Sequence, residues 1–184
     1  MSYTPEYIDT TSELISKKAD LLKTLIGQRL LASYVVWDID ENEWFFDGPV
    51  VLVFEKKKIE LCCNKLEEIS VTSGAADIGA NPIISWDPEG PYEWRKNALE
   101  EINCVIDNSV EKINIIEFEF ITWPAGENSS SPNAISNWIL NGLDFYFSKG
   151  FFSFFNALDE NGITNKEIRD VEIRKFDLNG KIVI

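Results

Sequence analysis

The stretch 49-PVVLVFEKKKIELCCNKLEEISVT-72 decides the fold class, because it contains three strand patterns separated by two short polar turns. Residues 49–55 are rich in β-branched side chains with little alternation, which is typical of a strand covered on both faces. Residues 59–63 and 69–72 instead alternate apolar with polar or small side chains. Since short connections join neighbouring strands, the stretch predicts an antiparallel meander.

The alternation also assigns faces to the second and third strands of this meander. Ile59, Leu61 and Cys63 fall on one face, which we expect to be the core face. Glu60 and Cys62 then point the other way, and residue 70 is expected to do the same on the next strand.

A helical pattern precedes the meander. Thr10 and Glu13 form a Thr-x-x-Glu capping box, and the apolar residues that follow recur on one helical face. Gly27 stands where a helix C-terminus is commonly found. The sequence therefore predicts a helix over residues 11–26, packed across the sheet. Pro91 can begin a second, short helix over residues 92–103.

The rest of the chain is typical of further strands. Within residues 112–121 the apolar alternation changes phase at Ile115–Ile116, which predicts a β-bulge that lets both sets of side chains point inward. Asn141-Gly142, Asn161-Gly162 and Asn179-Gly180 each have the composition of a two-residue hairpin turn. The first and the last of these pairs have the clearest strand patterns on either side.

Together these patterns predict one α+β domain over residues 1–184. We expect a twisted antiparallel sheet of about seven to nine strands, packed by the N-terminal helix and one short central helix. Irregular loops are expected near residues 73–91 and 123–134, where glycine, proline and serine are frequent.

Composition excludes several classes of function. The chain has 31 acidic and 17 basic residues, for a net charge of −14, which repels nucleic-acid phosphates. It contains no histidine, which removes Ser-His-Asp and Cys-His catalysis and histidine-ligated zinc. The first residues of the sequence lack the basic start and apolar run of a secretory signal, so we expect none, and no apolar run approaches the roughly 20 residues of a membrane helix. We expect a cytoplasmic protein with reduced cysteines that binds neither nucleic acid nor membranes.

One segment has part of a calcium-binding pattern. Asp38, Asp40 and Asn42 have the spacing of an EF-hand loop. However, Glu43 stands where that loop requires glycine, and Pro49 stands where it requires a bidentate glutamate. We therefore expect no metal here, and the sequence contains no cofactor motif either.

A pair of carboxylates offers a catalytic alternative. Glu117 and Glu119 project from the same face of one expected strand, roughly 7 Å apart. That separation overlaps the range of inverting glycosidases, so a hydrolase that uses paired carboxylates stays open. The same spacing is common on any half-exposed strand, and for this reason we favour a protein that is not an enzyme.

Negative charge is concentrated in two parts of the chain. Residues 37–47 contain five acids and no base, and residues 87–127 contain ten acids against three bases. A concentrated field of this kind steers a basic partner toward the protein, although negative charge also favours solubility. Tryptophans in or beside expected loops add apolar contact area. The candidate partner-binding residues are therefore Asp38, Asp40, Glu41, Glu43, Trp44, Trp86 and Trp123.

In general character the chain resembles small acidic immunity proteins of bacteria, which neutralise secreted toxins. The resemblance lies in the absence of histidine, one helix before an antiparallel meander, and the aromatic, acidic run from Trp37 to Asp47. It implies a stoichiometric inhibitor whose acidic face covers a basic toxin or enzyme. A structural subunit that self-associates through exposed aromatic residues is a third possibility, and the sequence leaves the oligomeric state open.

Overall fold

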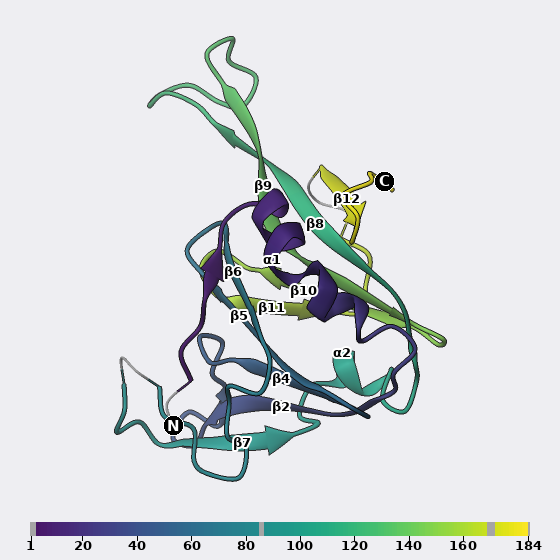
Figure 1. The fold of residues 1–184 in the computed structure, drawn as a ribbon. Helices are drawn as coiled ribbons and strands as arrows, with labels where there is room; N and C mark the ends of the chain where they lie inside the picture. The colour runs from purple at the N-terminus through teal and green to yellow at the C-terminus, as the bar shows by residue number, and fades with distance from the viewer. Residues whose placement is uncertain (1–2, 85–86, 169–171, 184) are drawn as a thin grey trace.

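The computed structural model describes residues 3–84, 87–168 and 172–183 (Figure 1). The described residues form antiparallel strands and two short helices, so the α+β class is confirmed. The predicted number of strands was too low, because the described residues form twelve strands in two sheets rather than seven to nine in one.

The first sheet contains the predicted meander. Its strand order is β1-β6-β5-β4-β2-β3, and β7 pairs with β2 beside this path. Consecutive antiparallel pairing of β4, β5 and β6 confirms the pattern from which the fold class was inferred. The bounds are Tyr7–Ile8 for β1, Leu30–Asp38 for β2, Glu43–Trp44 for β3, Val50–Phe54 for β4, Lys58–Asn64 for β5, Glu68–Thr72 for β6 and Tyr92–Lys96 for β7.

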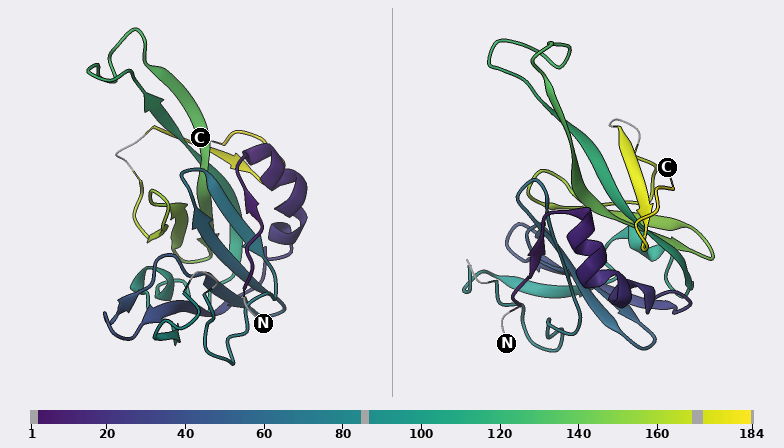
Figure 2. Two further views of the ribbon diagram at one scale, coloured as in Figure 1. Left: turned by 90° about the vertical axis from the view of Figure 1, so that its left-hand side faces the viewer. Right: turned by 45° about the horizontal axis from the view of Figure 1, so that its top comes forward.

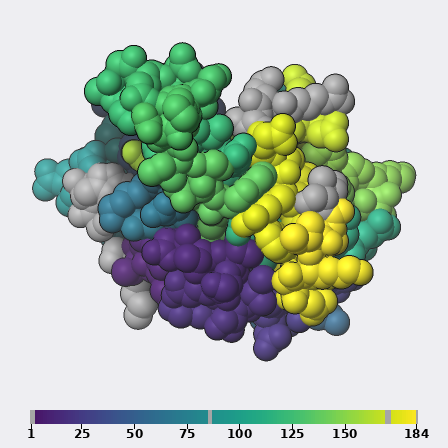
Figure 3. Space-filling model, turned by 90° about the horizontal axis from the view of Figure 1, so that it is seen from above, coloured from purple at the N-terminus to yellow at the C-terminus, as the bar shows by residue number. Residues whose placement is uncertain are grey.

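The second sheet has the order β11-β10-β9-β8-β12. Two of its strands are long, and their outer part projects from the rest of the molecule (Figure 2). We call this outer part, residues 118–139, the arm. Seen from above, α1 and β12 lie beside the base of the arm (Figure 3). The bounds are Val110–Thr122 for β8, Ile135–Phe147 for β9, Phe151–Asn156 for β10, Asn161–Thr164 for β11 and Ile173–Asp177 for β12.

The N-terminal helix α1 spans Thr11–Lys23 and begins where the sequence predicts. The hydroxyl oxygen of Thr10 accepts a hydrogen bond from the backbone N–H of Glu13 at 3.3 Å. The helix ends three residues earlier than residue 26, and Gly27 has a φ of +84°. Its N–H donates to the carbonyl oxygen of Val110 at 2.8 Å, which ties this end of the helix to β8.

The second predicted helix was largely wrong. Residues 92–96 form strand β7, which pairs with β2 from Asp38↔Tyr92 to Tyr34↔Lys96. Only α2, Glu100–Asn103, is helical within the predicted range. β7 pairs with the edge of β2 opposite to β4 and β3, and hydrogen bonding to that edge overrides the local helical pattern.

One apolar core serves both sheets and α1. It contains Leu14 of α1, Leu52 of the first sheet and Phe145 of the second, and each of these side chains is fully buried. Phe145 also stacks on Phe152 of the neighbouring strand, with ring centroids 5.1 Å apart. Burial of such side chains supplies most of the driving force that holds the two sheets together.

The outward face predicted for the meander is buried. Glu60, Cys62 and Ser70 point away from the core as expected, but the N-terminal segment and the loop after β6 cover them. The Glu60 carboxylate accepts hydrogen bonds from the Thr72 hydroxyl at 2.9 Å and from the Ala76 N–H at 3.1 Å. Alternation in a sequence therefore separated the two faces correctly without showing what covers the second one.

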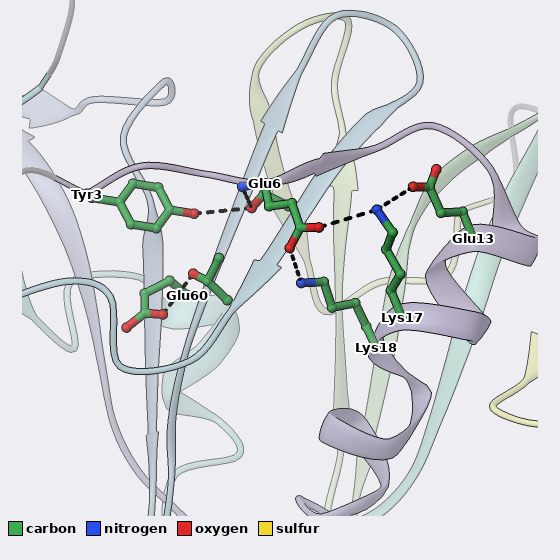
Figure 4. A network of polar contacts seen from close by, with 8 residues as sticks. Tyr3, Glu6, Glu13, Lys17, Lys18 and Glu60 are labelled. Atoms are coloured by element: carbon green, nitrogen blue, oxygen red, sulfur yellow. Dashed lines mark hydrogen bonds and ion pairs between the residues drawn. The ribbon is translucent and has the colours of Figure 1, made fainter.

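The covering N-terminal segment is held in place at both ends (Figure 4). The Tyr3 hydroxyl lies 3.5 Å from the Ser70 hydroxyl, to which the backbone N–H of Glu6 also donates. The Glu6 carboxylate binds Lys18 at 2.7 Å and Lys17 at 3.3 Å, both on α1. These two ammonium groups hold the pKa of Glu6 below its ordinary value.

The Asn-Gly pairs do not all form turns. Only Asn179-Gly180 lies in a turn, and Gly180 has a φ of +82°. Asn141-Gly142 lies inside β9 and Asn161-Gly162 begins β11, so these two turn predictions were wrong. In both strands glycine permits close approach of a neighbour, because a Cβ on either residue would collide with Phe155.

The predicted bulge is found one residue away from its expected place, on the partner strand. The pairing of β8 with β9 shifts between Ile116 and Glu117, and Asn141 of β9 is the extra residue. Ile115 and Ile116 are both buried, but the regular backbone of β8 directs them to opposite faces. The change of phase thus reflects cover on both faces of β8 rather than two sets of side chains on one face.

Candidate partner-binding surface

The turn between β2 and β3 presents four of the predicted carboxylates. One oxygen of Asp38 accepts hydrogen bonds from the backbone N–H groups of Asp40 and Glu41, at 2.9 and 3.1 Å. Asn42 adopts a φ of +55°, which completes the reversal of the chain. Asp38 is half-buried, whereas the side chains of Asp40, Glu41 and Glu43 are exposed.

A second acidic segment lies beside this turn. Pairing of Asp38 with Tyr92 places β7 next to the outer end of β2, and the N–H of Ile39 donates to the Pro91 carbonyl at 2.9 Å. The residues just before β7 include Asp87 and Glu89, which are exposed. Two stretches about fifty residues apart in the sequence therefore present their carboxylates together.

The hydroxyl of Tyr92 marks the place where these carboxylates converge. It donates a hydrogen bond to Asp87 at 2.8 Å. Burial, this hydrogen bond and the negative charges of Asp87, Asp38 and Asp47 raise the pKa of Tyr92 to about 12. Three carboxylates from two segments thus act on one buried phenol.

A third acidic segment comes from the turn between β10 and β11. A hollow of about 200 Å³ is lined by four acidic residues, Asp38, Glu43, Asp47 and Glu160, and by the segment Trp44–Phe46. Burial and the neighbouring charge of Asp159 raise the pKa of Asp47. Asp159 and Glu160 are not among the residues that the sequence predicted for partner binding, because their place on this surface depends on contacts with distant parts of the chain.

These three segments form what we call the acidic end. Arg95 is the one base in residues 37–47, 87–95 and 159–160, which gives a net charge of −9. Its guanidinium binds Glu93 at 2.6 Å and stacks on the Trp37 ring, 4.1 Å from the centroid. The ten carboxylates of the acidic end are Asp38, Asp40, Glu41, Glu43, Asp47, Asp87, Glu89, Glu93, Asp159 and Glu160.

Apolar side chains are exposed among these charges. Ile39 at the turn is 48% exposed, Phe46 is 40% exposed and Leu158 is 71% exposed. Exposed aliphatic and aromatic groups inside a charged rim are typical of surfaces that bind proteins. The acidic end therefore offers both charge and apolar contact area.

The candidate tryptophans do not gather on this surface. Trp44 is only 9% exposed and belongs to the apolar core, with its ring centroid 4.7 Å from that of the exposed Phe46, so it offers little contact area to a partner. Trp123 is 47% exposed but follows β8 at the outer end of the arm, on the side of the molecule away from β7 (Figures 1 and 2). Trp86 lies outside the described residues.

The paired carboxylates of the hydrolase alternative have separate partners. Glu117 is 7% exposed and forms an ion pair with Arg174 of β12, at 2.5 Å. Glu119 accepts a hydrogen bond from the hydroxyl of Ser136 on the facing strand. Each carboxylate is thus engaged by a neighbouring strand, an arrangement that serves the structure of the sheet.

The described ranges contain no group of three or more cysteine, aspartate or glutamate side chains arranged to hold a metal ion. Cys62 and Cys63 are buried free thiols, and burial raises the pKa of Cys62 to about 11. In the same part of the chain, no helix is both long enough and apolar enough to span a bilayer.

Comparison of the chain with protein-family models, with curated proteins and with solved structures finds no match.

Proposed function

We propose that the protein is a non-enzymatic binding protein whose acidic end captures a basic protein. The observation that carries this proposal is the convergence of ten carboxylates, from three separate segments, around the exposed side chains of Ile39 and Phe46. An immunity-type inhibitor that covers the basic site of a toxin or enzyme is the form of this function that the chain's general character favours.

The physical basis is electrostatic capture followed by apolar contact. A local charge of −9 attracts a basic surface over a distance of about 8–10 Å at physiological ionic strength. Once docked, the partner buries Ile39 and Phe46, and these contacts slow dissociation. Association should therefore slow as salt is added, while dissociation depends on the apolar residues.

The test compares three forms of the protein as bait. The first is the natural chain, and the second carries Asp40→Lys, Glu41→Lys and Glu43→Lys at the acidic end. The third is a matched control with the same change of charge elsewhere, Glu100→Lys, Glu101→Lys and Glu127→Lys. Each bait is immobilised and exposed to an extract of cells that produce the protein, and the captured proteins are identified by mass spectrometry at low and high salt.

We expect a basic protein on the natural and control baits at low salt only, and its absence from the second bait. Circular dichroism checks that all three forms are folded. Equal capture by the second bait and the control would disprove a role for the acidic end, as would a captured protein that is not basic.

A further inference from the structure

A groove of about 780 Å³ lies between α1 and the arm. It is bounded by the first turn of α1, the turn between β5 and β6, the inner part of the arm and β12. Among the described residues that line it, none belongs to the acidic end. Its volume falls within the range of ligand-binding pockets, and its lining mixes apolar with polar side chains.

One wall of the groove is the edge of a β-strand. Four consecutive residues of β9, Asn137–Leu140, line it, and successive residues of a strand point to opposite faces. Backbone atoms of β9 as well as its side chains therefore border the groove. β10 pairs with β9 from Gly142 to Tyr146, and within the described chain no strand continues that pairing along residues 137–140. Backbone groups on this edge can therefore accept an added strand.

The floor of the groove is apolar and held in place. Trp138, 36% exposed, shares the groove with Ile15 of α1 and Phe176 of β12. The guanidinium of Arg174 lies 4.5 Å from the centroid of the Trp138 ring and also binds Glu117. Arg174 thus orients the indole and neutralises the one carboxylate that lies inside the groove.

The remaining charges of the groove are negative and lie at its rim. Its ionisable lining residues are Asp9, just before α1, Glu67, in the β5–β6 turn, and Glu117. Asp9 and Glu67 are exposed, and Glu117 is paired with Arg174. An occupant that complements this lining combines apolar side chains with lysine or arginine.

We propose that the groove binds an extended, basic segment of a protein partner, which adds as a strand to the edge of β9. Its backbone pairs with residues 137–140, its apolar side chains cover Trp138, and its basic side chains approach Asp9 and Glu67. This inference goes beyond the proposed function, because it concerns a separate surface and a different mode of recognition.

The test uses a fluorescein-labelled synthetic peptide that alternates lysine and valine, with binding followed by fluorescence anisotropy at low salt. Two further peptides serve as comparisons. In one, glutamate replaces lysine, and in the other, alternate residues are N-methylated and cannot donate backbone hydrogen bonds. Hydrogen exchange of the natural protein, with and without the peptide, reports on the backbone amides of β9.

Two groove variants, Glu67→Lys alone and Glu67→Lys with Trp138→Ser, are compared with Trp123→Ser, which changes an exposed tryptophan on the arm outside the groove. We expect the groove variants and the N-methylated peptide to weaken binding by at least about tenfold. Trp123→Ser should leave binding unchanged, and the peptide should protect amides within residues 137–140.

Unchanged binding by Glu67→Lys, or equal binding of the N-methylated peptide, would overturn the proposal. Binding lost only in the triple variant of the acidic end would place the peptide there, which supports the proposed function and refutes this one. Dimerisation that the groove variants abolish, without any binding of the peptide, would show that a second copy of the chain occupies the groove.

Discussion

Asn161 donates two hydrogen bonds to the carbonyl oxygen of Phe46, one from its side chain at 2.5 Å and one from its backbone at 3.2 Å. The same side chain donates to the carbonyl of Gly48 and accepts from the N–H of Cys63, both at 2.6 Å. Asn161 is almost fully buried. One side chain thus joins β11 to β5 and to the loop before β4, and so positions one part of the acidic end against another.

Replacement of Asn161 by alanine should destabilise the protein severely. It leaves the N–H of Cys63 and the carbonyl of Gly48 without these partners, and each unsatisfied buried group costs about 1–3 kcal/mol. We expect a loss of about 3 kcal/mol or more in the free energy of unfolding, measured by urea denaturation. Asn137→Ala, at an exposed position on the arm, should change it by less than about 0.5 kcal/mol.

Gly142→Ala should also destabilise the fold. A Cβ at this position would overlap the carbonyl oxygen of Phe154 and lie 2.8 Å from the Cα of Phe155. Overpacking against backbone atoms costs about 1–3 kcal/mol, and we expect the upper part of that range. Gly126→Ala is the comparison, since Gly126 has open space around it and only its φ of +87° is unfavourable. Equal melting temperatures for the two variants would contradict this interpretation.

Removal of one partner of the Lys175–Asp144 ion pair should strongly lower the free energy of unfolding. Asp144 is fully buried, Lys175 is 8% exposed, and their charged atoms are 2.7 Å apart. Lys175→Met leaves a buried carboxylate without a positive partner, held only by the hydroxyls of Ser153 and Tyr146, which costs about 3–5 kcal/mol. The double variant with Asp144→Leu removes both charges and should recover much of that loss in denaturant unfolding. A double variant as unstable as the single one would show that packing, not charge, dominates at this site.

Tyr92 should ionise about two pH units above its ordinary pKa of 10.0, at about 12. The folded protein favours the neutral hydroxyl, so this group stabilises the fold below pH 10 and loses that contribution between pH 10 and 12. The difference between the ultraviolet titration curves of the natural chain and of the Tyr92→Phe variant isolates the ionisation of Tyr92. Asp87→Asn should lower the measured pKa, because it removes the nearest negative charge. An unchanged value would show that Asp87 does not contribute, and that burial and the charges of Asp38 and Asp47 account for the raised pKa.

Local patterns in the sequence predicted the elements that local interactions decide. Thr10 caps α1 as its hydroxyl suggests, and the β4–β5–β6 meander follows from alternation and short turns. In contrast, β7 is a strand because β2 offers it an edge, and no local feature of residues 92–96 reports that edge. The burial of Glu60 has the same kind of cause, since its cover comes from another segment.

The candidate surface divides in the same way. Asp40, Glu41 and Glu43 were identified because they share one turn, and turn residues are exposed. The contribution of Glu160 depends on the hydrogen bonds of Asn161, whose partner Phe46 lies 115 residues away in the sequence. Trp44 is buried for a related reason, because a ring next to a turn points inward when the core lies beneath it.

The arm offers a natural place to divide the chain. Its outer loop, residues 123–134, lies beyond the paired strands β8 and β9, which continue into the body of the protein. A chain cut between Gly126 and Glu127 keeps Val110–Thr122 paired with Ile135–Phe147, so the two pieces should remain associated. The two unequal pieces, produced separately and held together by the pairing of β8 with β9, would make a reporter that assembles from two fragments.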